Sequence, residues 1–144
     1  MVKRYLLDSN VWIQVLRANK PRASDRLIAY RVALTPPSEV AGCATVRAEL
    51  IHGAWKYEDP AKRIAKVEIL LGKFDSLPFD DRAADVYGRI RDELERSGNV
   101  IGPFDMQIAA IALVHDLTVV TSNVSEFRRV RNLRVEDWSV LAHG

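Results

Sequence analysis

A short apolar run leads directly into an acidic residue near the start of the chain, at Tyr5-Leu6-Leu7-Asp8. Continuous apolar residues, rather than alternating ones, are typical of a strand that is covered on both faces. The helical pattern that follows at 11–16 places Asp8 where a strand turns into a helix. An open α/β sheet usually carries its ligand sites at such a point. Asp8 could equally be only the N-cap of the helix, because Asp is a common N-cap residue.

Strands of the same kind recur at 40–44 and 117–121, and helical patterns fill the segments between them. Thr45 is expected to be the N-cap of the helix that follows it. Strands that alternate with helices favour a parallel sheet with helices on both faces, so the sequence predicts an α/β fold. The helices are expected over residues 26–34, 46–55, 60–72, 81–96 and 104–114.

The composition suits a globular protein of one domain. The 144 residues match a single domain, residues 1–144, and 48% of them are hydrophobic. A formal net charge of +2 permits a nucleic-acid partner without requiring one. Cys43 is the single cysteine, so no intrachain disulfide can form, and no apolar stretch has the length of a targeting or membrane-spanning segment. We therefore expect a cytoplasmic protein.

Two further acids stand near the heads of expected helices. Asp105 lies in the first turn of a helix that is apolar nearly all round and is therefore expected to be buried. Glu49 lies in the second turn of another helix. Because the carboxyl ends of parallel strands face the same way, Asp8, Glu49 and Asp105 are expected to converge on one rim of the sheet. For Asp105, a favourable interaction with the helix dipole alone is the alternative. The polar residues expected between the acids are Ser9, Asn10, Thr121, Ser122 and Asn123.

Three carboxylates that lie close together repel one another unless they share protons or bind a cation. Oxygen ligands without histidine or cysteine select Mg²⁺ or Mn²⁺ over zinc. Such ions promote hydrolysis of phosphodiester bonds, and the sequence leaves open whether one or two would bind. Basic clusters are more often solvated surface than a groove for a polyanion, so they only permit RNA binding. The basic residues near the rim are Arg17, Lys20, Arg22, Arg128, Arg129, Arg131 and Arg134.

Five segments carry a family pattern when they are taken together and in order. They are Tyr5–Asn10, Thr45–Leu50 with Gly53, Ile101–Ala110, Leu117–Asn123 with Phe127, and Leu133–Trp138. This set resembles PIN-domain proteins and, more narrowly, the VapC type of toxin ribonuclease. The resemblance implies a three-layer α/β/α fold with a central, mostly parallel sheet.

The resemblance also implies an activity and partners. It implies a Mg²⁺- or Mn²⁺-dependent endoribonuclease, the toxin of a toxin–antitoxin pair, that cuts cellular RNA. A cognate VapB-like antitoxin would cover the cleft, and homodimers are usual in the family. Carried over by position, Asp8, Glu49 and Asp105 match the family's acidic metal ligands. Asn10 and Thr121 look like hydrogen-bonding groups that support those ligands.

One position departs from the family pattern. Many PIN domains carry a further acid near Asn123, where this chain has an amide. The amide could orient a water or bind metal through its carbonyl oxygen, but it supplies no charge. Glu126 is a nearby acid that could compensate, and the alternative is a loop acid that faces solvent.

Two other functions fit parts of the pattern. An aspartyl-phosphate phosphohydrolase also places an Asp at a strand end, but it would need a second acid two positions later, where Asn10 stands. A catalytically silent binding module with the same fold is the other alternative, and the intact Asp8, Glu49 and Asp105 favour the enzyme over it. Stabilisation by Mn²⁺ would discriminate between an acid cluster and an empty fold.

Overall fold

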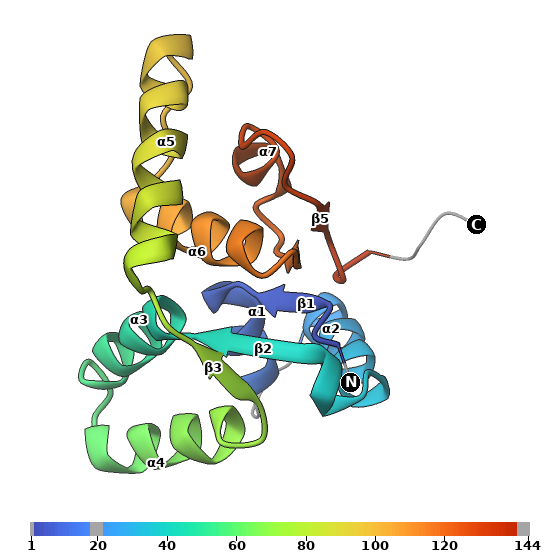
Figure 1. Ribbon diagram of the computed structural model, residues 1–144. Coiled ribbons are helices and arrows are strands. Elements are labelled where there is room, and N and C mark those ends of the chain that lie inside the picture. The colour runs from blue at the N-terminus through green and yellow to red at the C-terminus, as the bar shows by residue number, and fades with distance from the viewer. Residues whose placement is uncertain (1, 18–21, 141–144) are drawn as a thin grey trace.

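The computed structural model describes residues 2–17 and 22–140, which form one parallel sheet with helices around it (Figure 1). The strand order is β3-β2-β1-β4-β5, and each neighbouring pair is parallel. The predicted first strand is therefore the central one, with Leu6 opposite Ala41 on one side and Val119 on the other. The strands are β1 (Tyr5–Leu7), β2 (Val40–Cys43), β3 (Asp75–Leu77), β4 (Thr118–Val120) and β5 (Val135–Glu136).

Helices cover both faces of this sheet, which confirms the predicted three-layer α/β/α arrangement. Figure 1 shows α5 and α6 on one side of the sheet and α4 on the other. The helices are α1 (Ser9–Leu16), α2 (Ala23–Leu34), α3 (Ala44–Ala54), α4 (Pro60–Leu71), α5 (Asp81–Ser97), α6 (Pro103–Val114) and α7 (Val124–Phe127), with a 3₁₀ turn, η1 (Pro37–Glu39).

Local capping chemistry sets most of the helix boundaries where the sequence predicts them. The side chain of Asp59 accepts a hydrogen bond from the Lys62 amide at the start of α4. Asp80 caps α5 through the Ala83 amide in the same way. Gly98 ends α5 with a φ of 71°, a conformation that glycine adopts more easily than other residues.

The predicted start of the third helix was wrong by two residues. Cys43, not Thr45, is the N-cap of α3, because its backbone is extended while Ala44 is already helical. Thr45 therefore lies inside the first turn, where its side chain is buried and donates a hydrogen bond to Gln107. The helix α2 also begins earlier than predicted, and Asp25 closes its first turn instead of preceding it.

The core lies between the middle of the sheet and the most apolar helix. Leu6, Leu7 and Val119 are fully buried in the central strands. The predicted burial of α6 is confirmed, since its inner turns carry a run of buried apolar residues and it packs along α5. Among the described residues, no helix combines the length and apolar character that a membrane span requires.

Candidate active site

Asp8 stands at the carboxyl end of the central strand, as predicted, and only 4% of it is exposed. Its Oδ1 atom accepts a hydrogen bond from the Ser9 amide at 2.6 Å. Its Oδ2 atom accepts one from the Thr121 hydroxyl at 2.7 Å. Asp8 is also the N-cap residue of α1, which confirms the N-cap interpretation, whereas its role as a metal ligand stays a prediction. The two hydrogen bonds fix the carboxylate at the end of the sheet.

Burial raises the pKa of the Asp8 carboxyl above its ordinary value. The hydrogen bonds from Thr121 and Ser9 oppose this rise in pKa, and the negative charge of Glu49 adds to it. The structure therefore holds Asp8 in a place where a negative charge is only partly compensated by hydrogen bonds.

Ser9 links Asp8 to the second acid. Its hydroxyl donates to Glu49 Oε1 at 2.6 Å, across from α1 to the partly exposed Glu49 side chain on α3. Asn10, which the sequence indicated as a supporting residue, is exposed, and the hydrogen bonds to these carboxylates come from Ser9 and Thr121 instead. Whether Ser9 or Asn10 reaches the carboxylates depends on which of the two side chains α1 directs toward the rim of the sheet.

Asp105, in the first turn of α6, belongs to the same electrostatic group. Burial raises the pKa of Asp105 to about 7. The negative charges of Asp8, Glu126 and Glu49 contribute to the raised pKa. The three predicted acids lie far apart in the sequence, yet their charges act on one another in the folded protein. This agrees with the convergence that is expected of parallel strand ends.

Glu126 is a fourth acid of this group. It lies on α7, its side chain is partly buried, and its charge contributes to the raised pKa of Asp105. Glu126 is therefore a partly buried residue of a short helix, and its part in the site stays a prediction. The short helix α7 brings it back toward the rim from a start at Asn123, and such a four-residue helix leaves almost no periodic signal in the sequence.

The two remaining supporting residues occupy the loop after β4. Thr121 contacts both Asp8 and the start of α7, because its hydroxyl oxygen also accepts a hydrogen bond from the backbone amide of Asn123 at 2.9 Å. Asn123 is partly exposed and acts as the N-cap residue of α7 without a capping hydrogen bond from its side chain. A role for the Asn123 side chain at the site stays a prediction.

The basic residues divide into structural and exposed groups. Arg17 forms an ion pair with the buried Asp25 at 3.4 Å, so it stabilises the start of α2. Burial acts to raise the pKa of Asp25, but hydrogen bonds from the Arg22 amide and Arg17 outweigh it and lower the pKa overall. Arg128 and Arg129 are exposed and remain candidates for RNA binding.

Three other basic residues complete this picture. Arg131 and Arg134 pair with Glu93 and Asp116, each at 3.0 Å. Lys20 lies outside the residues that the structure describes. RNA contacts by these three residues stay unsupported by geometry.

The carboxylate oxygens of the acid group are of the type that binds a divalent cation, but in this structure they do not surround a single point. Within residues 2–17 and 22–140, no group of three or more His, Cys, Asp or Glu side chains is arranged so that it could hold a metal ion. All donors of the acid group are oxygens, which suit Mg²⁺ or Mn²⁺. The raised pKa values of Asp8 and Asp105 show negative charge that a cation would compensate.

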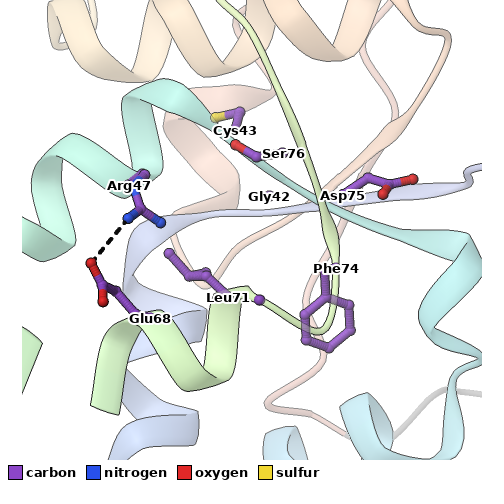
Figure 2. A pocket seen from close by; sticks show the side chains of 9 residues that line it. Gly42, Cys43, Arg47, Glu68, Leu71, Phe74, Asp75 and Ser76 are labelled. Atoms are coloured by element: carbon purple, nitrogen blue, oxygen red, sulfur yellow. Dashed lines mark hydrogen bonds and ion pairs between the residues drawn. The ribbon is translucent and has the colours of Figure 1, made fainter. Parts of the chain in front are cut away.

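A cavity of about 330 Å³ lies apart from the acids, between the sheet edge and α4 (Figure 2). An ion pair between Arg47 and Glu68, at 3.4 Å, spans one of its sides. Burial raises the pKa of the Cys43 thiol, which also lines it, to about 11, so this thiol stays protonated and weakly nucleophilic. The other lining residues are Gly42, Leu71, Gly72, Phe74, Asp75 and Ser76.

The raised pKa of Asp105 predicts a specific pH dependence of stability in metal-free buffer. Between its ordinary pKa of 3.8 and about 7, the folded protein retains a proton that the unfolded chain releases, so stability falls as pH rises through this range. Because asparagine does not titrate, the Asp105→Asn variant should not show this fall in stability with rising pH. Allowing for partial exposure, we expect it to gain about 1–2 kcal/mol over wild type at pH 8 and little at pH 4. Urea unfolding of both proteins in EDTA tests this, and parallel pH profiles would contradict it.

Known proteins with the same architecture cover nearly all of the chain. A family model for the PIN domain matches residues 5–133. The tRNA(fMet)-specific endonuclease VapC of Shigella flexneri is 38% identical over 136 residues, which are 94% of this chain and 98% of the relative. Ribonuclease VapC2 of Rickettsia felis is 31% identical over 93% of this chain and 97% of its own length.

Solved structures agree with these sequence relatives. The toxin chain in the crystal structure of DNA-bound VapBC from Salmonella typhimurium aligns with a TM-score of 0.83 at 37% identity, over 96% of this chain and 99% of that one. The crystal structure of VapBC2 from Rickettsia felis, bound to a DNA fragment from its promoter, gives 0.79 at 31% identity, over 96% and 99% of the two chains. The shared fold and the full-length similarity together show that this chain belongs to the PIN-domain family and, within it, to the VapC toxin ribonucleases.

Proposed function

We propose that this ribonuclease depends on Mg²⁺ or Mn²⁺ and that Asp8, Glu49, Asp105 and Glu126 form its metal-binding and catalytic group. The observation that carries the proposal is the effect of three carboxylates on the fourth: the charges of Asp8, Glu49 and Glu126 all contribute to the raised pKa of Asp105. Four acids from four separate elements have no structural need to face one another. A shared cation gives a physical reason for the arrangement.

The four acids have different parts in this proposal. Asp8 is the fixed ligand, since both of its oxygens are held by hydrogen bonds from Ser9 and Thr121. Glu49 and Asp105 are partly exposed, so their side chains can rotate inward to complete a coordination sphere. A divalent cation bound there supplies Lewis-acid activation of the phosphodiester and compensates the negative charge of the transition state.

Ser9 and Thr121 act as positioning residues in the same proposal. Each makes one hydrogen bond to Asp8, and Ser9 makes a second to Glu49. Outer partners of this kind orient the oxygens that face a metal and limit the rotation of the carboxylates. The backbone amide of Asn123 donates a hydrogen bond to the Thr121 hydroxyl, and we propose no charge-bearing role for the Asn123 side chain.

The aspartyl-phosphate alternative does not agree with the position of Asp8. An attacking carboxylate needs an accessible oxygen with a free lone pair directed at the phosphorus. Asp8 is almost completely buried, and each of its oxygens already accepts a hydrogen bond. A fixed, buried carboxylate of this kind is better suited to orienting a cation than to forming a covalent bond with phosphate.

We also propose an antitoxin and a substrate class. The relatives' structures contain VapBC complexes with DNA, in one case a promoter fragment, so we propose that this chain pairs with a VapB-like antitoxin. We also propose a homodimer, which is what the family resemblance implies. The substrate that we propose is cytoplasmic RNA. The Shigella and Salmonella relatives bear the name tRNA(fMet)-specific endonuclease, which makes transfer RNA the first class to test.

Inducible expression in bacteria tests the function as a whole. We expect wild type to stop growth and to produce discrete RNA fragments, whereas Asp8→Ala should allow growth at the same protein level. Asp116→Asn is the matched control, because Asp116 is an exposed acid that pairs with Arg134 at the amino end of β4, away from the acid group. Growth arrest without RNA cleavage, or equal arrest by Asp8→Ala, would argue against a toxin ribonuclease.

A further inference from the structure

A partly buried hydrogen bond joins the two helices that carry Glu49 and Asp105. The Thr45 hydroxyl, in the first turn of α3, donates to Gln107 Oε1, in the second turn of α6, at 2.9 Å. Thr45 is only 5% exposed, and Gln107 is partly buried. The Thr45 end of the bond is therefore shielded from water, which weakens competition for its hydroxyl.

The position of this bond relative to the acids is informative. Glu49 follows Thr45 by four residues, so the two side chains lie on one face of α3, one turn apart. Asp105 precedes Gln107 by two residues in the opening turns of α6. The hydrogen bond thus ties α3 to α6 close to the place from which each helix presents its carboxylate.

The acids themselves act against this contact. Glu49 and Asp105 carry like charges on two helices that contact each other, and like charges repel. Hydrogen bonds from other elements hold Asp8 and Glu49, but these bonds run to α1 and to the loop after β4 rather than to α6. The Thr45–Gln107 hydrogen bond is a direct polar link between α3 and α6, the helices that carry Glu49 and Asp105.

We propose that Thr45 and Gln107 form a clamp that sets the separation of Glu49 and Asp105 and so determines how tightly the acid group binds a divalent cation. Both residues act through the carboxylates and are positioning residues. This inference rests on the proposed metal dependence. Loss of an outer partner that orients metal ligands typically weakens metal binding by about 10–100-fold.

The clamp is tested by titrating Mn²⁺ into metal-free protein by calorimetry. Thr45→Val keeps the shape of the side chain but removes the donor, and we expect the Mn²⁺ dissociation constant to rise by about tenfold. Thr45→Ser retains the hydroxyl and should bind within about twofold of wild type, since it keeps the same hydrogen bond.

A matched control separates positioning from stability. Thr118→Val also removes a buried threonine hydroxyl that is hydrogen-bonded, here to Arg134 at 3.3 Å, but at the amino end of β4. It should lower the melting temperature and leave the Mn²⁺ dissociation constant unchanged. If Thr45→Val fails to fold, Gln107→Met opens the clamp from the partly exposed side, and it should weaken Mn²⁺ binding by a similar factor.

The outcomes distinguish this inference from the proposed function. Wild type that binds no Mn²⁺ refutes the metal dependence, and the clamp with it. Wild type that binds Mn²⁺ while Thr45→Val and Gln107→Met bind it equally well refutes only the clamp. Weaker binding by both variants, with no further loss in the double variant, supports a single shared contact.

Discussion

The Asp8→Asn variant is expected to cleave RNA at least about a thousandfold more slowly than wild type, a loss of several kcal/mol of transition-state stabilisation. The substitution keeps the size of the side chain but removes the charge that would hold the cation. The amide can still accept a hydrogen bond from Thr121 or Ser9 through its oxygen. The fold should therefore persist. Burial disfavours the charged form of Asp8, and a neutral amide avoids this cost, which should offset the lost hydrogen bond.

Cleavage of a labelled RNA by purified protein, together with thermal unfolding of the same sample, measures both effects. Asp116→Asn serves as the control because it also changes an aspartate to its amide, at a side chain that is 88% exposed. Its ion pair with Arg134 is exposed, so we expect a loss of stability below about 1 kcal/mol and no change in cleavage. Equal activity of Asp8→Asn and wild type would remove Asp8 from the mechanism.

Removal of metal is expected to have an effect as large as the loss of Asp8. EDTA should reduce RNA cleavage by wild type to background, and Mn²⁺ or Mg²⁺ should restore it. Because a ligand that binds only the folded state stabilises it, Mn²⁺ at a hundred times its dissociation constant should add about 2.7 kcal/mol. For a chain of 144 residues this corresponds to a rise in melting temperature of about 5–10 °C.

The matched control for the metal effect is a variant that lacks two of the ligands. In the double variant Asp8→Asn with Asp105→Asn, Mn²⁺ should change the melting temperature by less than about 1–2 °C, because the site no longer carries enough charge. If this variant and wild type were stabilised equally, Mn²⁺ would be acting elsewhere on the protein. Cleavage that continues undiminished in EDTA would contradict metal dependence directly.

The parts of the fold that the sequence predicts correctly are those with strong local signals. The apolar run before Asp8 gave the central strand, and the apolar segment after Asp105 gave the buried helix α6. Helix α4 follows from Asp59 and Pro60, whose side chains specify a helix start on their own. Convergence of the acids then followed from the parallel arrangement of the strands.

The parts that the sequence could not give depend on contacts between distant segments. Ser9 and Asn10 are both polar neighbours of Asp8, and only the packing of α1 against α3 selects Ser9 as the bridge to Glu49. Thr45 was predicted to be an N-cap because it precedes a helical pattern. Its actual hydrogen-bond partner, Gln107, lies 62 residues away in the sequence. Such pairs have no local pattern that single-sequence reasoning can detect.

Short elements were missed for a different reason. The strand β5, of two residues, and the helix α7, of four, are too brief to show any periodicity. Glu126 therefore looked like a loop acid, although α7 turns it toward Asp105. The sequence names Glu126 as a nearby acid, but only the fold shows that its charge acts on Asp105.

The most direct test of the central claim is to count Mn²⁺ ions on the protein by electron paramagnetic resonance, in which free Mn²⁺ gives a signal that bound Mn²⁺ does not. If Asp8, Glu49, Asp105 and Glu126 share a cation site, wild type should remove one or two Mn²⁺ ions per chain from the free signal at saturation. Asp8→Asn should bind at least about tenfold more weakly. Wild type that binds no Mn²⁺, or Asp8→Asn that binds as many ions as wild type with equal affinity, would contradict the account.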